Sequence, residues 1–219
     1  MKILAISDVI VPYIYSSRVV ERFGDVNLLI SCGDLPYYYQ EYVTTLLNVP
    51  AFYVRGNHSR KIVRLDGETQ TKPLGGVDLH RNVVDYKGLL MAGVEGSLRY
   101  SGGPYQYTQE EMWLHVLHLF PGLLKNRMLK GRYLDIFVTH APPSGIHSET
   151  DLPHQGIHAF RWLLKVFKPA YLLHGHIHIY NPETIRKTYF DQTLVINVFR
   201  FYELTVRPGI RPVPEAARG

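Results

Sequence analysis

Polar side chains that could do chemistry recur directly after short apolar runs in this sequence of 219 residues. Apolar runs of strand length that close on a polar cluster predict buried β-strands. Because ligands bind at the carboxyl ends of strands in open α/β sheets, we expect these side chains to share one edge. They are Asp8, the pair Gly33-Asp34, the run Gly56-Asn57-His58, His140 and the run Gly175-His176-Ile177-His178.

These residues provide carboxylate and amide oxygens and imidazole nitrogens, without a thiolate. Such donors suit divalent ions such as manganese, iron or zinc, and differ from those of a structural thiolate zinc site. The number of donors exceeds the need of one ion and approaches the need of two. The sequence therefore predicts a centre for two divalent metal ions, manganese first, with iron, zinc or magnesium as alternatives. Its ligands would be Asp8, Asp34, Asn57, His140, His176 and His178.

Five apolar runs position these side chains, and stretches of helical character separate several of them. The predicted strands cover residues 3–7, 26–31, 51–55, 134–139 and 170–174, and the predicted helices cover 16–23, 40–47, 108–119 and 158–167. Thr108 followed by Glu111 is typical of a capping box. Near-continuous apolar strands that alternate with helices predict an α/β protein whose sheet is covered on both faces.

The pattern changes after Gly175, where runs at 184–190, 194–198 and 201–206 follow without helices between them. These runs, and those at 77–79 and 89–93, predict antiparallel strands and a second sheet packed on the first. Residues 208–219 contain Pro, Arg and Gly without periodicity. We therefore predict one domain over residues 1–207 and a loose C-terminal extension over 208–219.

At this point the chain resembles the calcineurin-like metallophosphoesterase family. The family's ordered motifs are Asp-x-His, Gly-Asp, Gly-Asn-His, a later His and Gly-His-x-His. Here they read Asp8-Val9-Ile10, Gly33-Asp34, Gly56-Asn57-His58, Thr139-His140-Ala141-Pro142-Pro143 and Gly175-His176-Ile177-His178. The resemblance implies two packed mixed β-sheets flanked by helices, a four-layer αββα sandwich.

The resemblance also implies roles for the individual residues. Asp34 would bridge two metal ions, with Asp8 and His178 at the first and Asn57, His140 and His176 at the second. A hydroxide held between the ions would attack phosphorus in line. His58 would face the leaving group as the catalytic acid or charge stabiliser. Residues two apart on a regular strand share a face, so His176 and His178 can serve different ions only if the chain leaves strand geometry.

Two positions depart from the family pattern. Ile10 stands where the family has a histidine ligand of the first metal, so we expect weaker binding there but retained catalysis. Ser59 stands where relatives commonly have an acidic residue, which leaves the orientation of His58 open. Whether Tyr13, Tyr37 or His147 compensates for the missing ligand stays open.

Substrate selection is only weakly specified. Arg99, in a glycine-rich stretch, could bind a phosphate group or be structural. The run Tyr37-Tyr38-Tyr39 could stack on a nucleobase, although packing is the heavier alternative. Five other histidines are interpreted as ordinary polar or packing residues: His115, His118, His147, His154 and His174.

Composition sets bounds on function and location. The net charge of +5 favours anionic partners weakly, and no basic run marks a nucleic-acid track, so nucleic acid is possible but not favoured. A single cysteine, Cys32, forms no internal disulfide and fits a reducing compartment. No apolar stretch has transmembrane length. We expect a cytoplasmic protein that does not bind membranes, with its oligomeric state open.

Three functions follow in order of preference. The first is a metal-dependent phosphatase or phosphodiesterase that hydrolyses a phosphomonoester or phosphodiester, for example a small nucleotide. The second is a non-catalytic scaffold, because a retromer subunit uses the same fold with a degraded metal site. Ile10 and Ser59 favour the scaffold, whereas His58, which a scaffold does not need, favours the enzyme. The third is a nuclease, favoured slightly by the positive charge.

Overall fold

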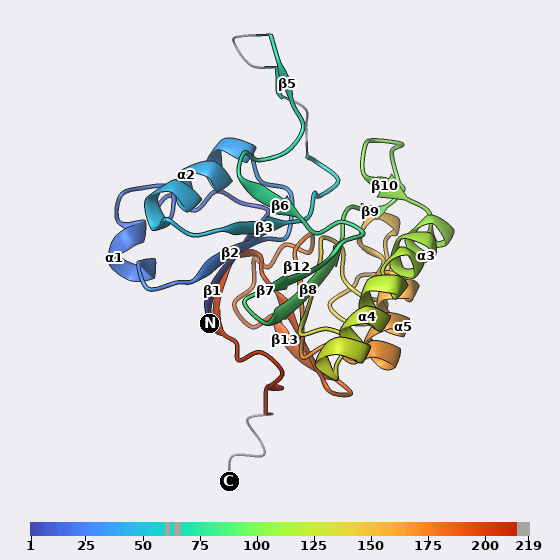
Figure 1. The fold of residues 1–219 in the computed structure, drawn as a ribbon. Helices are drawn as coiled ribbons and strands as arrows, with labels where there is room; N and C mark the ends of the chain where they lie inside the picture. The colour runs from blue at the N-terminus through green and yellow to red at the C-terminus, as the bar shows by residue number, and fades with distance from the viewer. Residues whose placement is uncertain (60–61, 64–66, 214–219) are drawn as a thin grey trace.

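Two mixed β-sheets pack face to face, and helices cover the outer face of each sheet (Figure 1). This four-layer α/β arrangement is seen in a computed structural model that describes residues 1–59, 62–63 and 67–213. Within those residues, no helix is both long and apolar enough to cross a membrane.

The first sheet has five strands in the order β15-β1-β2-β3-β6. Its inner strands are parallel, and β15 runs antiparallel to β1 at the edge. The strands are β1 (Lys2–Ser7), β2 (Leu28–Ser31), β3 (Ala51–Tyr53), β6 (Gly76–Asp78) and β15 (Arg200–Thr205). Helices α1 (Val19–Phe23) and α2 (Tyr37–Leu47) cover its outer face (Figure 1).

The second sheet has six strands in the order β13-β14-β12-β11-β8-β7, of which the central four are parallel. The strands are β7 (Val83–Tyr86), β8 (Leu89–Val94), β11 (Ile136–Thr139), β12 (Tyr171–His174), β13 (Lys187–Phe190) and β14 (Thr193–Asn197). Its outer face is covered by α3 (Gln109–His118), α4 (Phe120–Lys130) and α5 (His158–Phe167) (Figure 1).

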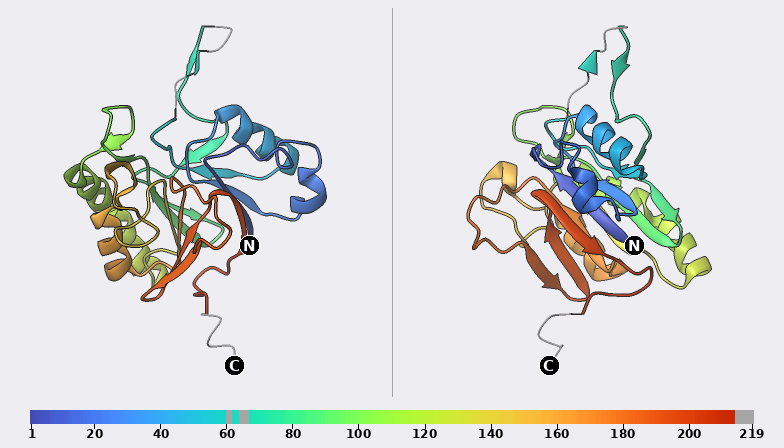
Figure 2. Two further views of the ribbon diagram at one scale, coloured as in Figure 1. Left: turned by 180° about the vertical axis from the view of Figure 1, so that it is seen from behind. Right: turned by 90° about the vertical axis from the view of Figure 1, so that its left-hand side faces the viewer.

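Short elements decorate this body. Strands β9 (Ser97–Leu98) and β10 (Gln106–Tyr107) pair beside α3, and a 3-10 turn, η1, covers Leu152–His154. The hairpin of β4 (Ile62–Val63) and β5 (Thr69–Gln70) projects from the body beyond α2 (Figure 2).

Three apolar clusters fill the spaces between the four layers. The cluster between the sheets contains Ile3, Met91 and Ile196. A second, which includes Phe160, packs the six-stranded sheet against its helices, and a third, which includes Phe23, does the same for the five-stranded sheet. Strands buried on both faces explain the near-continuous apolar runs of the sequence, and the predicted fold class is confirmed.

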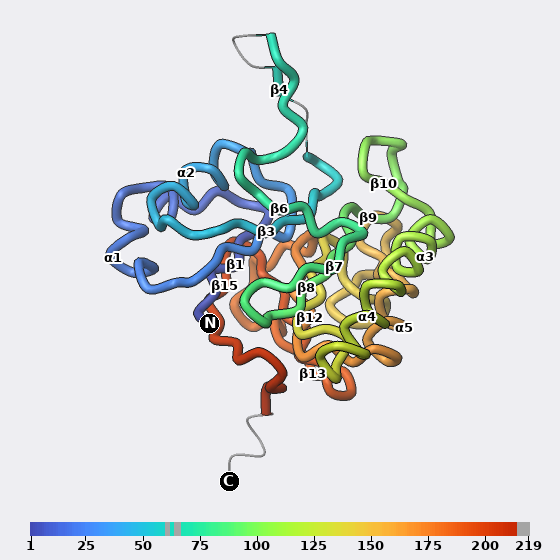
Figure 3. The backbone as a smooth tube through the Cα atoms, viewed as in Figure 1, coloured from blue at the N-terminus to red at the C-terminus, as the bar shows by residue number. Residues whose placement is uncertain are grey.

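The strand directions differ in part from the sequence predictions. The run at 194–198 is β14, which is antiparallel to β13 but parallel to β12, and β6 is parallel to β3. The run at 201–206 is β15, which leaves this sheet and pairs with β1 of the other (Figure 3). The run at 89–93 is β8, which is antiparallel to β7 but parallel to β11. Antiparallel pairing was therefore wrong for β6 and incomplete for β8 and β14, because the side-chain pattern of a strand does not specify its neighbour.

Helix α4, strand β7 and the short elements β4, β5, β9, β10 and η1 were not predicted, and several bounds move. The predicted third helix ends at 119, whereas α4 begins at Phe120 with Pro121 in its first turn, where proline removes no helical hydrogen bond. Strand β7 has an exposed edge and lacks a clear apolar run. The Thr108 capping box is present as predicted. Beyond β15, Gly209 N donates to Asp135 Oδ1 (2.9 Å), and residues 214–219 of the predicted extension lie outside the described residues.

Candidate metal centre

The carboxyl ends of β1, β2 and β3 in one sheet and of β11 and β12 in the other meet at one place. The predicted ligands follow these five strands, so the site lies between two sheets and not on the edge of one. Asp8, Asp34 and His176 each have a left-handed backbone, with φ of 66°, 55° and 68°. This conformation is uncommon for residues other than glycine and turns each chain sharply at the end of its strand.

Glycines allow the backbone and side chains of the site to approach closely. A Cβ at Gly56 would lie 2.0 Å from Asp34 Oδ1, and one at Gly175 would lie 1.9 Å from Ser7 Oγ and 2.7 Å from Asp8 Oδ2. A Cβ at Gly33 would lie 2.7 Å from His140 Nδ1. The glycines of three motifs are therefore required by space.

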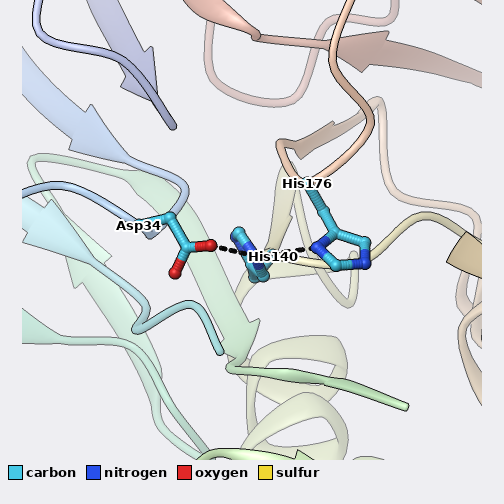
Figure 4. Close-up of side chains that lie close together, drawn as sticks. All are labelled: Asp34, His140 and His176. Carbon is cyan, nitrogen blue, oxygen red and sulfur yellow. Dashed lines mark hydrogen bonds and ion pairs between the residues drawn. The ribbon is translucent and has the colours of Figure 1, made fainter. Parts of the chain in front are cut away.

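Donor atoms of four predicted ligands converge around the buried ring of His140, and Figure 4 shows three of these residues, Asp34, His140 and His176. His140 Nε2 lies 3.2 Å from Asp34 Oδ2, 2.9 Å from Asn57 Oδ1 and 3.2 Å from His176 Nδ1. Ligand atoms of Asp34, His140 and His176 lie within 4.8 Å of one another. Segments from two sheets thus bring oxygen and nitrogen donors to one point.

The outer nitrogens of the two imidazoles are held by backbone carbonyls. His140 Nδ1 lies 2.8 Å from Cys32 O, and His176 Nε2 lies 2.8 Å from Pro153 O. A carbonyl only accepts, so His140 Nδ1 and His176 Nε2 each donate a proton, and in a neutral ring the lone pairs of His140 Nε2 and His176 Nδ1 would face inward. Asn57 Nδ2 donates to Tyr100 OH (3.0 Å), which turns the amide oxygen inward as well.

Without a metal, a proton provides the positive charge that this donor set requires. Burial lowers the pKa of His140, but the Asp34 carboxylate outweighs burial and raises it to about 9. Burial raises the pKa of Asp34, but the charge and hydrogen bond of His140 lower it to about 2. Burial and the charge of His140 lower the pKa of His176 to about 3. A proton shared among electron-pair donors is what a metal ion displaces on binding.

The Asp8 and His178 side of the site is more open. His178 Nε2 lies 4.0 Å from Asp8 Oδ1, and Asp8 Oδ1 accepts from His176 N (2.9 Å). Asp8 Oδ2 is buried and, among the described residues, has no hydrogen-bond partner. Burial raises the pKa of Asp8. His176 and His178 therefore face different partners. This agrees with the left-handed backbone at His176, which takes the chain out of regular strand geometry.

Ile10 packs against the apolar cluster under α1 and α2 and offers no donor to Asp8. None of the residues considered as substitutes takes its place. Tyr37 OH donates to Thr71 O, Tyr13 packs against the same apolar cluster as Ile10, and His147 lies between His174 Nε2 (2.8 Å) and Thr188 Oγ1 (2.9 Å). The first metal position thus has fewer protein donors than the second.

His58 is exposed and its backbone N donates to Asp34 Oδ1 (2.8 Å). Its side chain lines a cavity of about 290 Å³ with Asp34, Tyr37 and Ile62. Ser59 Oγ accepts from Gly56 N (3.0 Å), so it closes the turn that carries His58. The serine therefore supports the backbone of His58 and not its ring.

Other candidates have structural partners. Arg99 forms an ion pair with Glu111 (2.9 Å), and the hydroxyls of Tyr37 and Tyr39 bond to backbone groups, which favours the packing alternatives. His154, predicted to be an ordinary polar residue, has its ring centroid 5.3 Å from that of His176. Tyr100 and the carbonyls of Cys32 and Pro153 were not predicted, because backbone groups and contacts between distant segments leave no pattern in a sequence.

The comparisons with known proteins give the class. A family model described as calcineurin-like phosphoesterase matches residues 1–180. The chain therefore belongs to the calcineurin-like phosphoesterase family, as the order of its motifs predicts. No curated protein matches the chain.

Comparison with solved structures finds similar chains at low sequence identity. TT1561 of Thermus thermophilus is 16% identical with a TM-score of 0.57, over 91% of this chain and 89% of that one. YfkN of Bacillus subtilis, a calcineurin-like phosphoesterase, is 11% identical with a TM-score of 0.44, over 95% and 86%. Vacuolar protein sorting 29 from Cryptosporidium parvum is 14% identical with a TM-score of 0.44, over 91% and 74%.

The family's divalent metal centre fits the residues present. Four donor side chains converge on one point, where a proton on His140 provides the positive charge in the metal-free protein, and Asp8 Oδ2 is a buried carboxylate oxygen that lacks a partner among the described residues. Hard and borderline oxygen and nitrogen donors suit a divalent ion. We take Asp34, Asn57, His140 and His176 as the better-formed half of the site and Asp8 with His178 as the sparser half.

Proposed function

We propose that this chain is a metal-dependent phosphoric ester hydrolase acting on a small phosphomonoester or phosphodiester. The observation that carries the proposal is the convergence of Asp34 Oδ2, Asn57 Oδ1 and His176 Nδ1 on His140 Nε2. A buried set of electron-pair donors with carbonyl-held outer nitrogens is costly unless a cation completes it.

The chain's own residues would then divide the work. Asp34, Asn57, His140 and His176 would hold one divalent ion, and Asp8 and His178, with Asp34, the other. Such ions polarise phosphoryl oxygens and lower the pKa of bound water. His58, exposed beside the cavity next to Asp34, would stabilise or protonate the leaving oxygen.

The test is hydrolysis of bis-p-nitrophenyl phosphate and p-nitrophenyl phosphate by metal-stripped protein reconstituted with Mn, Zn, Mg or Ca. We expect turnover that depends on metal and falls at least ~100-fold in Asn57→Ala and His58→Ala, the scale of a lost general acid. His158→Ala is a matched control, because His158 is exposed at the start of α5 and is neither a predicted metal ligand nor part of the lining of the cavity beside His58. Turnover without metal, or unchanged in His58→Ala, contradicts the proposal.

A non-catalytic scaffold is the second candidate, and the packing of Ile10 favours it. An isoleucine in the apolar cluster leaves Asp8 with a buried oxygen that has no partner among the described residues. A chain that had lost catalysis would tolerate this loss. Folded protein that shows no turnover with any of the four metals would support the scaffold.

A further inference from the structure

A pocket of about 610 Å³ lies where the end of α1 meets residues 179–203. Three arginines, Arg22, Arg186 and Arg200, contribute to its wall. The rest of the described lining is mostly aromatic or apolar: Ile179, Tyr180, Pro182, Phe199, Phe201 and Tyr202, with Glu203 as its acidic member. The pocket therefore combines guanidinium groups with ring faces.

The positive charge of this pocket is not neutralised by the protein. Among the described residues, no carboxylate forms an ion pair with Arg22, Arg186 or Arg200, and Glu203 pairs with Lys2 Nζ (3.4 Å). Burial and then the neighbouring charge of Arg200 lower the pKa of Arg186. Like charges brought together without a counter-charge favour binding of an anion.

A second basic pocket on the protein shows the contrast. Four cations contribute to its lining: Arg127, Arg132, Lys168 and Arg211. Arg132 forms an ion pair with Asp135 (2.8 Å) and Lys168 forms one with Asp191 (3.2 Å). Two of these four cations thus have carboxylate partners, whereas none of the three arginines of the first pocket has one among the described residues.

The guanidinium groups of the first pocket are held in place by rings and carbonyls. Arg186 Nη2 donates to Phe199 O and Phe201 O, each at 3.1 Å. Arg22 Cζ lies 5.5 Å from the centroid of Phe201, and Arg200 Cζ lies 5.8 Å from that of Phe199. Arg186 Nε and Nη2 are thus occupied by carbonyls, which leaves the guanidinium forks of Arg22 and Arg200, held over rings, to bind the oxygens of a phosphate group. Less entropy is lost on binding when the cations are already oriented.

The pocket shares its wall with the candidate metal centre. The ring of Phe199 stacks on that of His178, with centroids 4.8 Å apart and planes at 30°. Tyr180, also in the wall, places its hydroxyl 2.9 Å from His178 Nδ1. A group bound in the pocket therefore lies one side chain away from a predicted metal ligand.

We propose that this pocket binds a phosphate group of a small molecule, at a position separate from the metal centre. Its role rests on the proposed function: the phosphate would be a second anionic group of the substrate, beyond the ester that is hydrolysed. The substrate would then carry at least two phosphate groups, or a diphosphate, with one in the pocket and the scissile ester at the metals. Three cations near one another match such a ligand better than a single carboxylate.

The experiment is calorimetric titration of the full chain with inorganic pyrophosphate, with a chelator present so that no metal binds the probe at the centre. We expect saturable binding that weakens at least ~10-fold in Arg22→Gln and in Arg200→Gln, as loss of one charge-assisted contact predicts. Both side chains are exposed, so the variants should fold, which circular dichroism checks. Arg207→Gln is the matched control, because Arg207 is exposed and lies outside the pocket.

Three results would overturn the proposal. These are no binding of pyrophosphate to the unaltered chain, equal weakening in Arg207→Gln, and an arginine-dependent affinity for a single-stranded oligonucleotide that exceeds that for pyrophosphate. The last result would replace a small molecule by nucleic acid. Failure of the proposed function looks different, because it would abolish ester turnover with every metal while leaving pyrophosphate binding intact.

Discussion

A methyl group added at Gly56 tests whether the close approach of the strand ends builds the site. The Cβ of Gly56→Ala would lie 2.0 Å from Asp34 Oδ1, 2.5 Å from Asp34 Cγ and 2.7 Å from Asp34 N. Ordinary contacts begin at 3.4 Å, so the carboxylate has to move by more than ~1 Å or the two backbones have to separate. The backbone atom in this contact cannot rotate away.

The expected cost is roughly 3 kcal/mol of unfolding free energy, the upper part of the range for overpacking at a rigid site. For a chain of this size that corresponds to a fall in Tm of roughly 6–12 °C. Because Asp34 is displaced, we also expect metal affinity to fall ~10-fold or more. Urea unfolding of the metal-free protein and manganese titration measure the two effects separately.

Gly103→Ala is the control for Gly56→Ala. Its nearest contact, at 3.0 Å, is Gln106 Nε2, the end of a flexible side chain. We expect a change within ~0.5 kcal/mol, as for most surface substitutions. If Gly56→Ala matched this control in stability and in metal affinity, the close packing of Gly56 on Asp34 would not be what positions the carboxylate.

Three further predictions concern single side chains. Tyr100→Phe removes the acceptor of Asn57 Nδ2 (3.0 Å), so metal affinity should fall ~10-fold with little change in fold; an unchanged manganese titration would refute the positioning role. Ile10→His restores a nitrogen donor near Asp8, so we expect it to retain more metal than the unaltered chain after mild chelation, as measured by mass spectrometric metal analysis. Ile10→Val is the control and should retain no more metal than the unaltered chain. If the unaltered chain already retained two metal ions, the first metal position would not be weak. Burial raises the pKa of the Tyr39 hydroxyl to about 12, above the ordinary tyrosine value, so its contribution to stability is fully present below pH ~10 and is lost as the pH rises through about 12. Urea unfolding across that alkaline window should show a steeper loss in the unaltered chain than in Tyr39→Phe, and equal slopes would argue against a buried neutral phenol.

The sequence alone determined the fold class and the identity of the donors. Apolar runs of strand length ending in Asp, Asn or His specify both a buried sheet and a polar edge, because burial and strand ends are local properties of the chain. The capping box at Thr108 and the helix at His158–Phe167 were predictable for the same reason. The glycines of the motifs were visible, but the atoms that exclude a Cβ at each were not.

Only the tertiary structure decided which strands pair and what surrounds each donor. Strand β15 pairs with β1 from the far end of the sequence, with Lys2 opposite Thr205 and Ser7 opposite Arg200, and no local pattern specifies such a partner. The tautomers of His140 and His176 depend on the carbonyls of Cys32 and Pro153, which any residue type would offer. Arg22 and Arg200 line the same pocket because α1 lies beside the start of β15. Hydrogen bonding and charge act through space between distant segments, so the chemistry of the site is fixed only once the chain has folded.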